Sequence, residues 1–127
     1  MLFRSIGFQL SNLWFEGPDQ QNYTSSLSGH QLPVSSDGSR YYIVAHRDPG
    51  VRGWVDTTGL EKGTHSMRFI FREQPTAAEL PTATVHVVDL EDLSLVLPPD
   101  TPAVSPVQRR QEIAIRQSHI KRRWRGH

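Results

Sequence analysis

The sequence predicts a mainly β domain that ends in one long helix, and three observations lead to this prediction. Glycine and proline together make up 18 of the 127 residues, a share slightly above the usual one of roughly 12%, as a fold rich in turns requires. Several segments alternate apolar and polar residues with the period of a half-buried strand. The last segment combines a helix-start signal with apolar residues at helical spacing.

Alternation locates the expected strands. Residues 6–10 alternate apolar and polar side chains, and residues 64–72 place their aromatic residues on one face. Residues 30–34 and 40–46 flank a Ser-Asp-Gly-Ser turn signal, so we expect them to form a hairpin. Residues 82–88 are rich in valine and threonine and form the last expected strand.

Two helices are expected in the second half of the chain. Asp89 stands where it can cap a short helix over residues 90–97, which carries leucines on one stripe. Ser105, Pro106 and Gln108 form a capping-box pattern, which marks the start of a longer helix.

Length and charge predict one domain over residues 1–127, with a β body over residues 1–104 and a basic helix over residues 105–125. From Ser105 onward, seven Lys/Arg and one Glu give a charge of +6, whereas the preceding part carries −5. The chain has no cysteine, which excludes disulfides and thiol chemistry. No apolar run approaches the ~20 residues of a transmembrane helix. No signal-peptide pattern is present, so we expect a cytoplasmic location.

The densest motif of the chain is HRDPGVRGWVDTTGLEKG at residues 46–63. Together with GFQLSNLWFEGPD at residues 7–19, SLSGHQ at residues 26–31 and the Arg-aromatic strand at Arg68, it resembles the uncharacterised bacterial family called domain of unknown function 1214. The resemblance covers nearly all of the chain. It implies an antiparallel β-sandwich of jelly-roll type and no established activity.

The same resemblance implies a partner. Members of that family usually carry this domain at the C-terminal end of a longer protein, often behind a domain of unknown function 1254. An upstream domain or a partner chain of the same family is therefore expected. Two positions depart from the family pattern: Gly53 stands where Asn is frequent, and Leu60 stands where His is frequent. The loss of these polar groups favours a structural role for the segment.

The candidate catalytic residues are His46, Asp48 and Asp56. Histidine and carboxylate side chains act as general bases and as metal ligands, so these three predict an acid–base or metal-dependent site as an alternative. Their spacing matches no known metal motif, and no metal or cofactor is predicted. The favoured interpretation is structural: Asp48 and Asp56 cap the turns that follow them.

A small-molecule site is expected near Trp54, with Tyr42 and His30 as further ligand-binding candidates. The glycines around Trp54 would let a ligand approach the backbone, and its indole ring would provide a stacking surface. The competing interpretation, which we favour, is that Trp54 fills one end of the sandwich.

The basic C-terminal helix predicts an anion-binding surface as a further alternative. Its candidate residues are Arg109, Arg116, Arg122 and Arg123. A simpler interpretation is that the helix docks through its isoleucines while the arginines are solvated near a helix end that favours cations. Nucleic acid is disfavoured as a partner. The sequence as a whole predicts a non-catalytic domain, structural or ligand-binding, within a larger bacterial protein.

Overall fold

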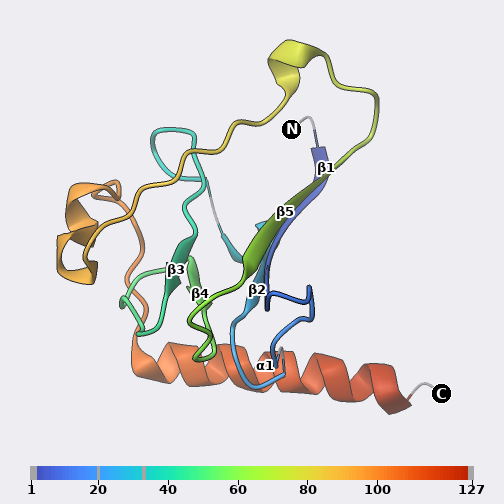
Figure 1. Cartoon of the computed structure of the whole chain (residues 1–127), viewed down its shortest axis with the longest axis vertical. Coiled ribbons are helices and arrows are strands. Elements are labelled where there is room, and N and C mark those ends of the chain that lie inside the picture. Colours follow the sequence, from blue (N-terminus) through green and yellow to red (C-terminus); the bar gives the residue numbers. More distant parts are fainter. Residues whose placement is uncertain (1–2, 20, 33, 126–127) are drawn as a thin grey trace.

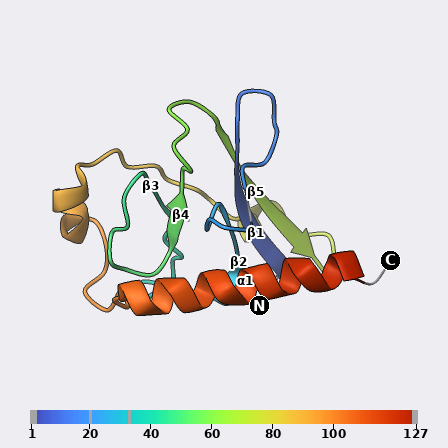
Figure 2. The ribbon, with the colours of Figure 1, turned by 90° about the horizontal axis from the view of Figure 1, so that it is seen from below.

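The computed structural model describes residues 3–19, 21–32 and 34–125. Within these ranges the chain forms two small sheets, three short 3-10 helices and one long C-terminal helix (Figure 1). The long helix, α1 (Pro106–Arg125), lies across one end of the molecule and runs past both sheets (Figures 1 and 2). None of the helices in these ranges combines the length and the apolar character that crossing a bilayer requires.

The larger sheet is antiparallel and has the strand order β2-β1-β5. Its strands are β1 (Phe3–Ser11), β2 (Ser26–Ser28) and β5 (Thr64–Phe71). The strands expected over residues 6–10 and 64–72 are therefore confirmed. Strand β1 lies in the middle, because it pairs with β2 on one side and with β5 on the other.

The two faces of this sheet differ in chemistry because side chains alternate along each strand. The inner face is apolar and carries Ile6, Phe8, Leu10, Leu27 and Met67. The outer face is polar and carries Gly7, Gln9, Ser26, Ser28, Ser66 and Arg68. The inner face must pack against other elements, whereas the outer face is available to solvent and to ligands.

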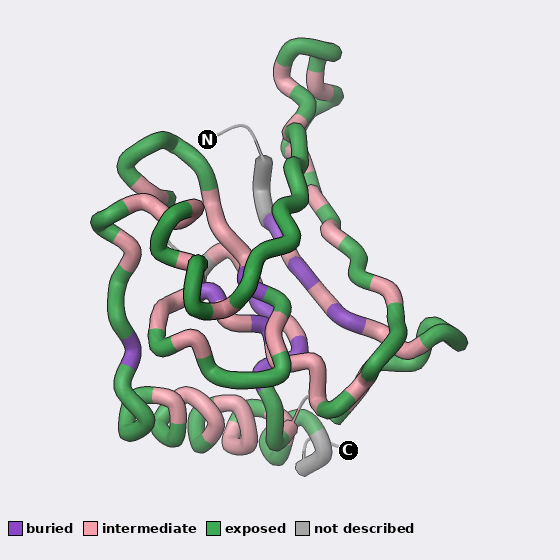
Figure 3. The backbone as a smooth tube through the Cα atoms, turned by 60° about the vertical axis from the view of Figure 1, so that its left-hand side comes forward, coloured by how far each residue is buried: buried purple, intermediate pink, exposed green. Residues whose placement is uncertain are grey.

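The smaller sheet pairs β3 (Ile43–Ala45) with β4 (Trp54–Asp56) in parallel. Val55 has no exposed surface, and it packs with Phe8, Leu10 and Leu27 into the hydrophobic core. The two sheets therefore meet through the inner face. Figure 3 shows the buried residues gathered in the middle of the molecule, while the loop at the top stands out from it.

The hairpin expected from residues 30–34 and 40–46 does not form, although its second strand is present in part as β3, which pairs with β4 instead. The expected turn is present, because the Gly38 amide donates to the Ser35 carbonyl at 2.9 Å. The first expected strand instead begins as a 3-10 helix, η1 (Gly29–Gln31). The Gln31 side chain accepts a hydrogen bond from the Ser28 amide at 2.9 Å, and this local bond favours a helical turn over a ladder.

The strand expected over residues 82–88 is also wrong. No ladder includes this segment within the described ranges, and Val85 and Val87 are 73% and 97% exposed. Before it, the chain forms the 3-10 helix η2 (Ala77–Glu79), in which Glu79 accepts from the Thr76 hydroxyl at 2.8 Å. Figure 1 shows the chain leaving β5 through η2 and running on to η3 without joining a strand.

Both predicted helices are present. The short helix forms as η3 (Leu90–Leu95), although Asp89 makes no side-chain capping bond. The capping box of α1 is confirmed: the Gln108 amide donates to Ser105 Oγ at 3.2 Å, and Gln108 Oε1 accepts from the Ser105 amide at 2.7 Å. The chain therefore mixes strands with helices, and its two small sheets do not confirm the predicted sandwich of jelly-roll type.

The core holds a tyrosine whose hydroxyl makes no hydrogen bond to any described residue. Tyr42 stacks on Phe8 with ring centroids 4.6 Å apart. Burial raises the pKa of the Tyr42 phenol, because a phenolate is poorly solvated in the core. In the unfolded chain the phenol titrates near 10, so its contribution to stability is complete below about pH 10 and is lost as the pH rises through the higher folded pKa.

We expect Tyr42→Phe to keep the free energy of unfolding at pH 7 or to raise it by up to about 1 kcal/mol. The reason is that a buried hydroxyl without a partner costs stability, while the stacked ring is retained. The variant should also lose less stability than the parent chain as the pH rises above about 10. Urea unfolding at several pH values measures both effects. A loss above about 1 kcal/mol at pH 7 would mean that the hydroxyl has a partner.

Candidate functional site

The predicted catalytic aspartates lie in two turns on either side of β4. Asp48 Oδ1 accepts a hydrogen bond from the Gly50 amide at 2.8 Å. Asp56 Oδ1 accepts one from the Thr58 amide at 2.8 Å. Both carboxylates thus cap the turn that follows them, as the structural interpretation of these two residues predicts.

His46 does not join these aspartates in a common site. It lies just after β3, and its Nδ1 is 2.6 Å from the hydroxyl of Thr57. Among the described residues, no group of three or more His, Asp or Glu side chains is arranged to hold a metal ion. Asp48 is engaged in the turn that follows it, whereas His46 and Asp56 contact Thr57 and Thr58 of the turn after β4.

Arg109 of α1 reaches across to the loop between β3 and β4. Its Nε lies 3.1 Å from Asp48 Oδ2, and its Nη2 lies 3.1 Å from Asp48 Oδ1. The same Nη2 donates to the Val51 carbonyl. The guanidinium also lies over the indole of Trp54, 5.3 Å from the ring centre. We call this set of contacts the Arg109 clamp. Its arginine side chain is only 12% exposed.

Trp54 belongs to the clamp instead of to an open ligand site. Alternation along β4 turns Val55 into the core and Trp54 to the opposite side. The indole N–H donates to the Ala45 carbonyl at 3.0 Å, and Arg109 covers the ring. Tyr42 is turned toward the core. The side chain of His30 lies outside the described part of the structure, so the three expected ligand-binding residues are not shown to come together.

Gly53 occupies a position that a larger residue does not fit. Its φ is +102°, in the region that favours glycine, and a Cβ there would collide with the Tyr41 carbonyl. Its own carbonyl accepts from the Ile43 amide at 2.8 Å, which starts the pairing of β3 with β4. In this chain, residue 53 is therefore fixed by backbone packing.

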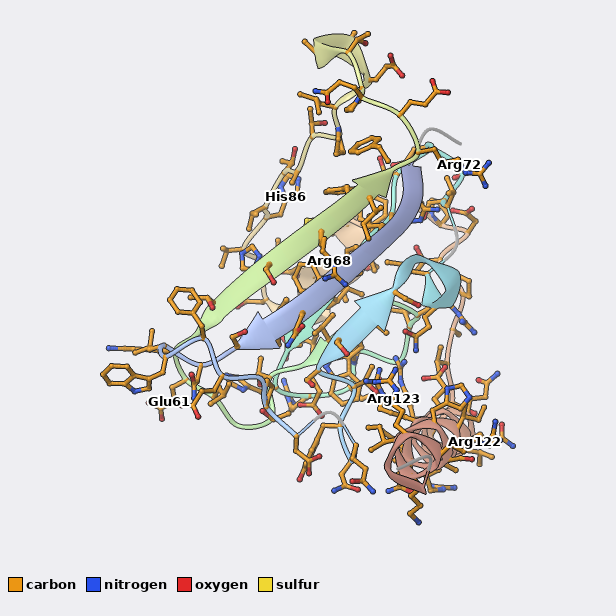
Figure 4. All side chains as sticks on the ribbon, turned by 90° about the vertical axis from the view of Figure 1, so that its right-hand side faces the viewer. Glu61, Arg68, Arg72, His86, Arg122 and Arg123 are labelled. Carbon is orange, nitrogen blue, oxygen red and sulfur yellow. The ribbon has the colours of Figure 1, made fainter. Side chains whose placement is uncertain are left out.

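The four arginines of the predicted anion-binding surface divide into two pairs. Arg109 and Arg116 are turned toward the body, so the expectation that they are solvated is wrong for both. Arg116 donates to the Ser26 carbonyl at 2.6 Å and to its hydroxyl at 3.2 Å. Burial lowers the pKa of Arg116, because desolvation penalises its charge. Arg122 and Arg123 are exposed on the last turns of α1 (Figure 4).

Two hollows are open on the surface of the described chain. The first, of about 280 Å³, lies on the outer face of the larger sheet, where Figure 4 shows Arg68 over the strands. We call it the outer-face cleft, and it is lined by Gly7, Phe8, Gln9, Ser26, Leu27, Ser28, Ser66 and Arg68. The second, of about 320 Å³, is lined by Pro49, Val51, Leu90, Glu91, Leu93, Ser94, Leu97, Pro98, Pro99 and Thr101.

Sequence reasoning did not single out the residues of the outer-face cleft. A glycine in a strand and scattered serines are common, and Arg68 stood out in the sequence only as part of the family resemblance. The cleft exists because the register sets Gly7 opposite both Ser28 and Arg68. A glycine within a predicted strand was the one available signal, since glycine often marks a place where another group approaches the backbone.

No protein-family model, curated protein or solved structure that we compared with this chain matches it. The resemblance to the domain of unknown function 1214 therefore stays a prediction. The chemistry of the chain has to be inferred from its own geometry.

We expect Arg109→Met to lower the free energy of unfolding by about 2–3 kcal/mol, because it leaves Asp48 without its charged partner in a partly buried setting. Arg110→Met is the matched control, since the neighbouring arginine is exposed and should change stability by less than about 0.5 kcal/mol. Urea unfolding of both variants measures the difference. Equal losses would show that the clamp does not hold α1 to the body.

Proposed function

We propose that this chain is a non-catalytic, small-ligand-binding domain, and that the outer-face cleft takes a small carboxylate that carries hydroxyl groups, such as a sugar acid. The observation that carries this proposal is an exposed arginine beside a glycine-floored hollow in the middle of a polar sheet face. The ligand site is thus moved from the vicinity of Trp54, where the sequence predicted it, to the other side of the larger sheet.

The cleft is built by the register of three strands. One row across the sheet consists of Ser28, Gly7 and Arg68, and the next consists of Ser26, Gln9 and Ser66. Nothing lies within 4 Å of the position that a Cβ of Gly7 would take. The hollow therefore forms because Gly7, at the centre of the sheet, has no side chain to fill it.

The chemistry of the lining favours a hydroxy acid. Arg68 makes no hydrogen bond or ion pair to another described residue, and a guanidinium binds a carboxylate through two parallel hydrogen bonds. The Ser66 hydroxyl and the Gln9 amide can donate to and accept from ligand hydroxyl groups. The Ser26 hydroxyl already accepts from Arg116, so it can still donate. The Ser28 hydroxyl already donates to Gln31, so it can still accept. No acidic side chain lines the cleft. Its volume of about 280 Å³ is just below the ~300–1,000 Å³ range of small-molecule sites, which suits a small ligand.

The non-catalytic part of the proposal rests on how the candidate catalytic groups are used. The Asp48 carboxylate is engaged by Arg109 and by the Gly50 amide. The Asp56 carboxylate holds the Thr58 amide. Groups held in this way are available to shape turns, and they are poorly suited to accept a proton from a substrate.

The finer fold assignment belongs to the same proposal. A β-sandwich of jelly-roll type, as the resemblance implies, has two packed sheets with polar outer faces. The contact between the inner face of the larger sheet and Val55 of β4 supports this arrangement. The polar outer face of the larger sheet is then one outside surface of the sandwich.

We expect D-gluconate to bind the outer-face cleft with millimolar affinity and to shift the amide resonances of Gly7, Ser28 and Arg68 in a two-dimensional NMR titration. Neutral D-glucose should leave these resonances unchanged. Arg68→Gln should weaken gluconate binding by about tenfold or more, because charge-assisted hydrogen bonds contribute about 1.5–3 kcal/mol.

Two further variants sharpen the test. Gly7→Val fills open space, so it should fold and yet abolish binding. Arg72→Gln is the matched control, because Arg72 is exposed just beyond the end of β5 and outside the cleft (Figure 4). Equal weakening by Arg68→Gln and Arg72→Gln, or equal shifts with glucose and gluconate, would contradict the proposal.

A further inference from the structure

The chain exposes more surface than its mass warrants. Its accessible surface is 9457 Å², whereas a compact monomer of 14.4 kDa exposes about 6,800 Å². The excess of about 2,600 Å² is larger than the roughly 800 Å² that each partner buries in a stable interface. The surface is therefore sufficient for a stable association to cover part of it.

Two elements of the described chain are suited to such an association. Strand β5 is at the edge of the larger sheet, and along residues 64–68 no described strand lies beside its outer side. The segment over residues 82–88, which we call the valine segment, is extended and makes no backbone hydrogen bond to another described residue. Strand β5 can therefore accept an additional strand, and the valine segment can supply one.

The two elements match in their alternation. On β5, Met67 lies on the inner face and Ser66 lies on the outer face. In an extended valine segment, Val85 and Val87 share one side, while Thr84, His86 and Val88 are on the other. If the segment paired with β5, Val85 and Val87 would extend the apolar inner face and His86 would extend the polar outer face. A register shifted by one residue would reverse this arrangement.

We propose that the valine segment of one copy adds to the outer edge of β5, along residues 64–68, in a second copy, so that two copies exchange strands in a symmetric dimer. Acceptor and donor are present in the same chain, so each copy can make the same contact with the other. This proposal does not rest on the outer-face cleft, since strand addition uses the edge of the sheet and leaves the outer face uncovered.

The chain holds its own valine segment away from β5. Before the segment, the chain turns at η2, where the Thr76 hydroxyl donates to the Glu79 carboxylate. After the segment, η3 borders the hollow beside Pro49 and Val51. Because η2 and η3 place both ends of the valine segment elsewhere, the edge of β5 can pair with a segment from another molecule.

The first test is the molar mass of the full chain by light scattering at concentrations up to about 100 μM, the range of a moderately tight dimer. A dimer is expected for the parent chain, and a monomer for the double variant V85K/V87K, because both valines are exposed in the single chain and buried in the dimer. Leu95→Lys is the matched control, since Leu95 is 83% exposed on η3 and should leave the dimer intact.

The second test uses the absence of native cysteine. One copy carries Ser66→Cys or R68C, a second copy of different length carries His86→Cys or T84C, and the mixture is oxidised. Disulfide-linked pairs of unlike copies are expected. A parent chain that stays monomeric, or a chain carrying both Ser66→Cys and His86→Cys that links only within itself, would overturn strand exchange.

Discussion

The contact between Arg109 and Asp48 is the constraint on which the rest of the structure depends. The chain after β4 makes a long excursion through β5, the valine segment and η3 before it returns as α1 (Figure 1). The Arg109 clamp joins this returning helix to the loop between β3 and β4. A partly buried arginine that binds both a carboxylate and a carbonyl defines one geometry, because each lost bond would leave a desolvated charge.

The clamp also explains why α1 lies flat across the molecule. Arg116 lies two turns after Arg109 on the same side of the helix, and it donates to Ser26 of β2. Gln117 then bonds to Asn22 at 2.9 Å. Polar side chains at intervals of two turns thus fasten one helix to both sheets. Arg109 and Arg116 serve internal contacts, whereas Arg110 and the basic residues 121–123 near the end of the helix are exposed.

Local patterns predicted local structure well in this chain. Strands β1 and β5 followed from alternation, and the start of α1 followed from Ser105 and Gln108, because each depends on neighbouring residues alone. The partner of β3 could not be predicted from the sequence, although the sequence of β3 favours a strand. β3 pairs with β4 because the Gly53 carbonyl accepts from the Ile43 amide, and the missing side chain of Gly53 leaves room for the Tyr41 backbone. The outer-face cleft was hidden for the same reason, since only the register unites its residues.

The failed prediction over the valine segment is informative in physical terms. Threonine and valine give this segment a strand preference, but a strand exists only when another backbone satisfies its hydrogen bonds, and η2 and η3 direct the segment away from β5. In the valine segment, the local preference for a strand therefore conflicts with the position of the segment in the fold. Natural sequences rarely keep such a conflict without a compensating interaction. An edge strand with matching alternation in a second copy supplies that interaction, because it offers the backbone partner that the segment lacks in the single chain.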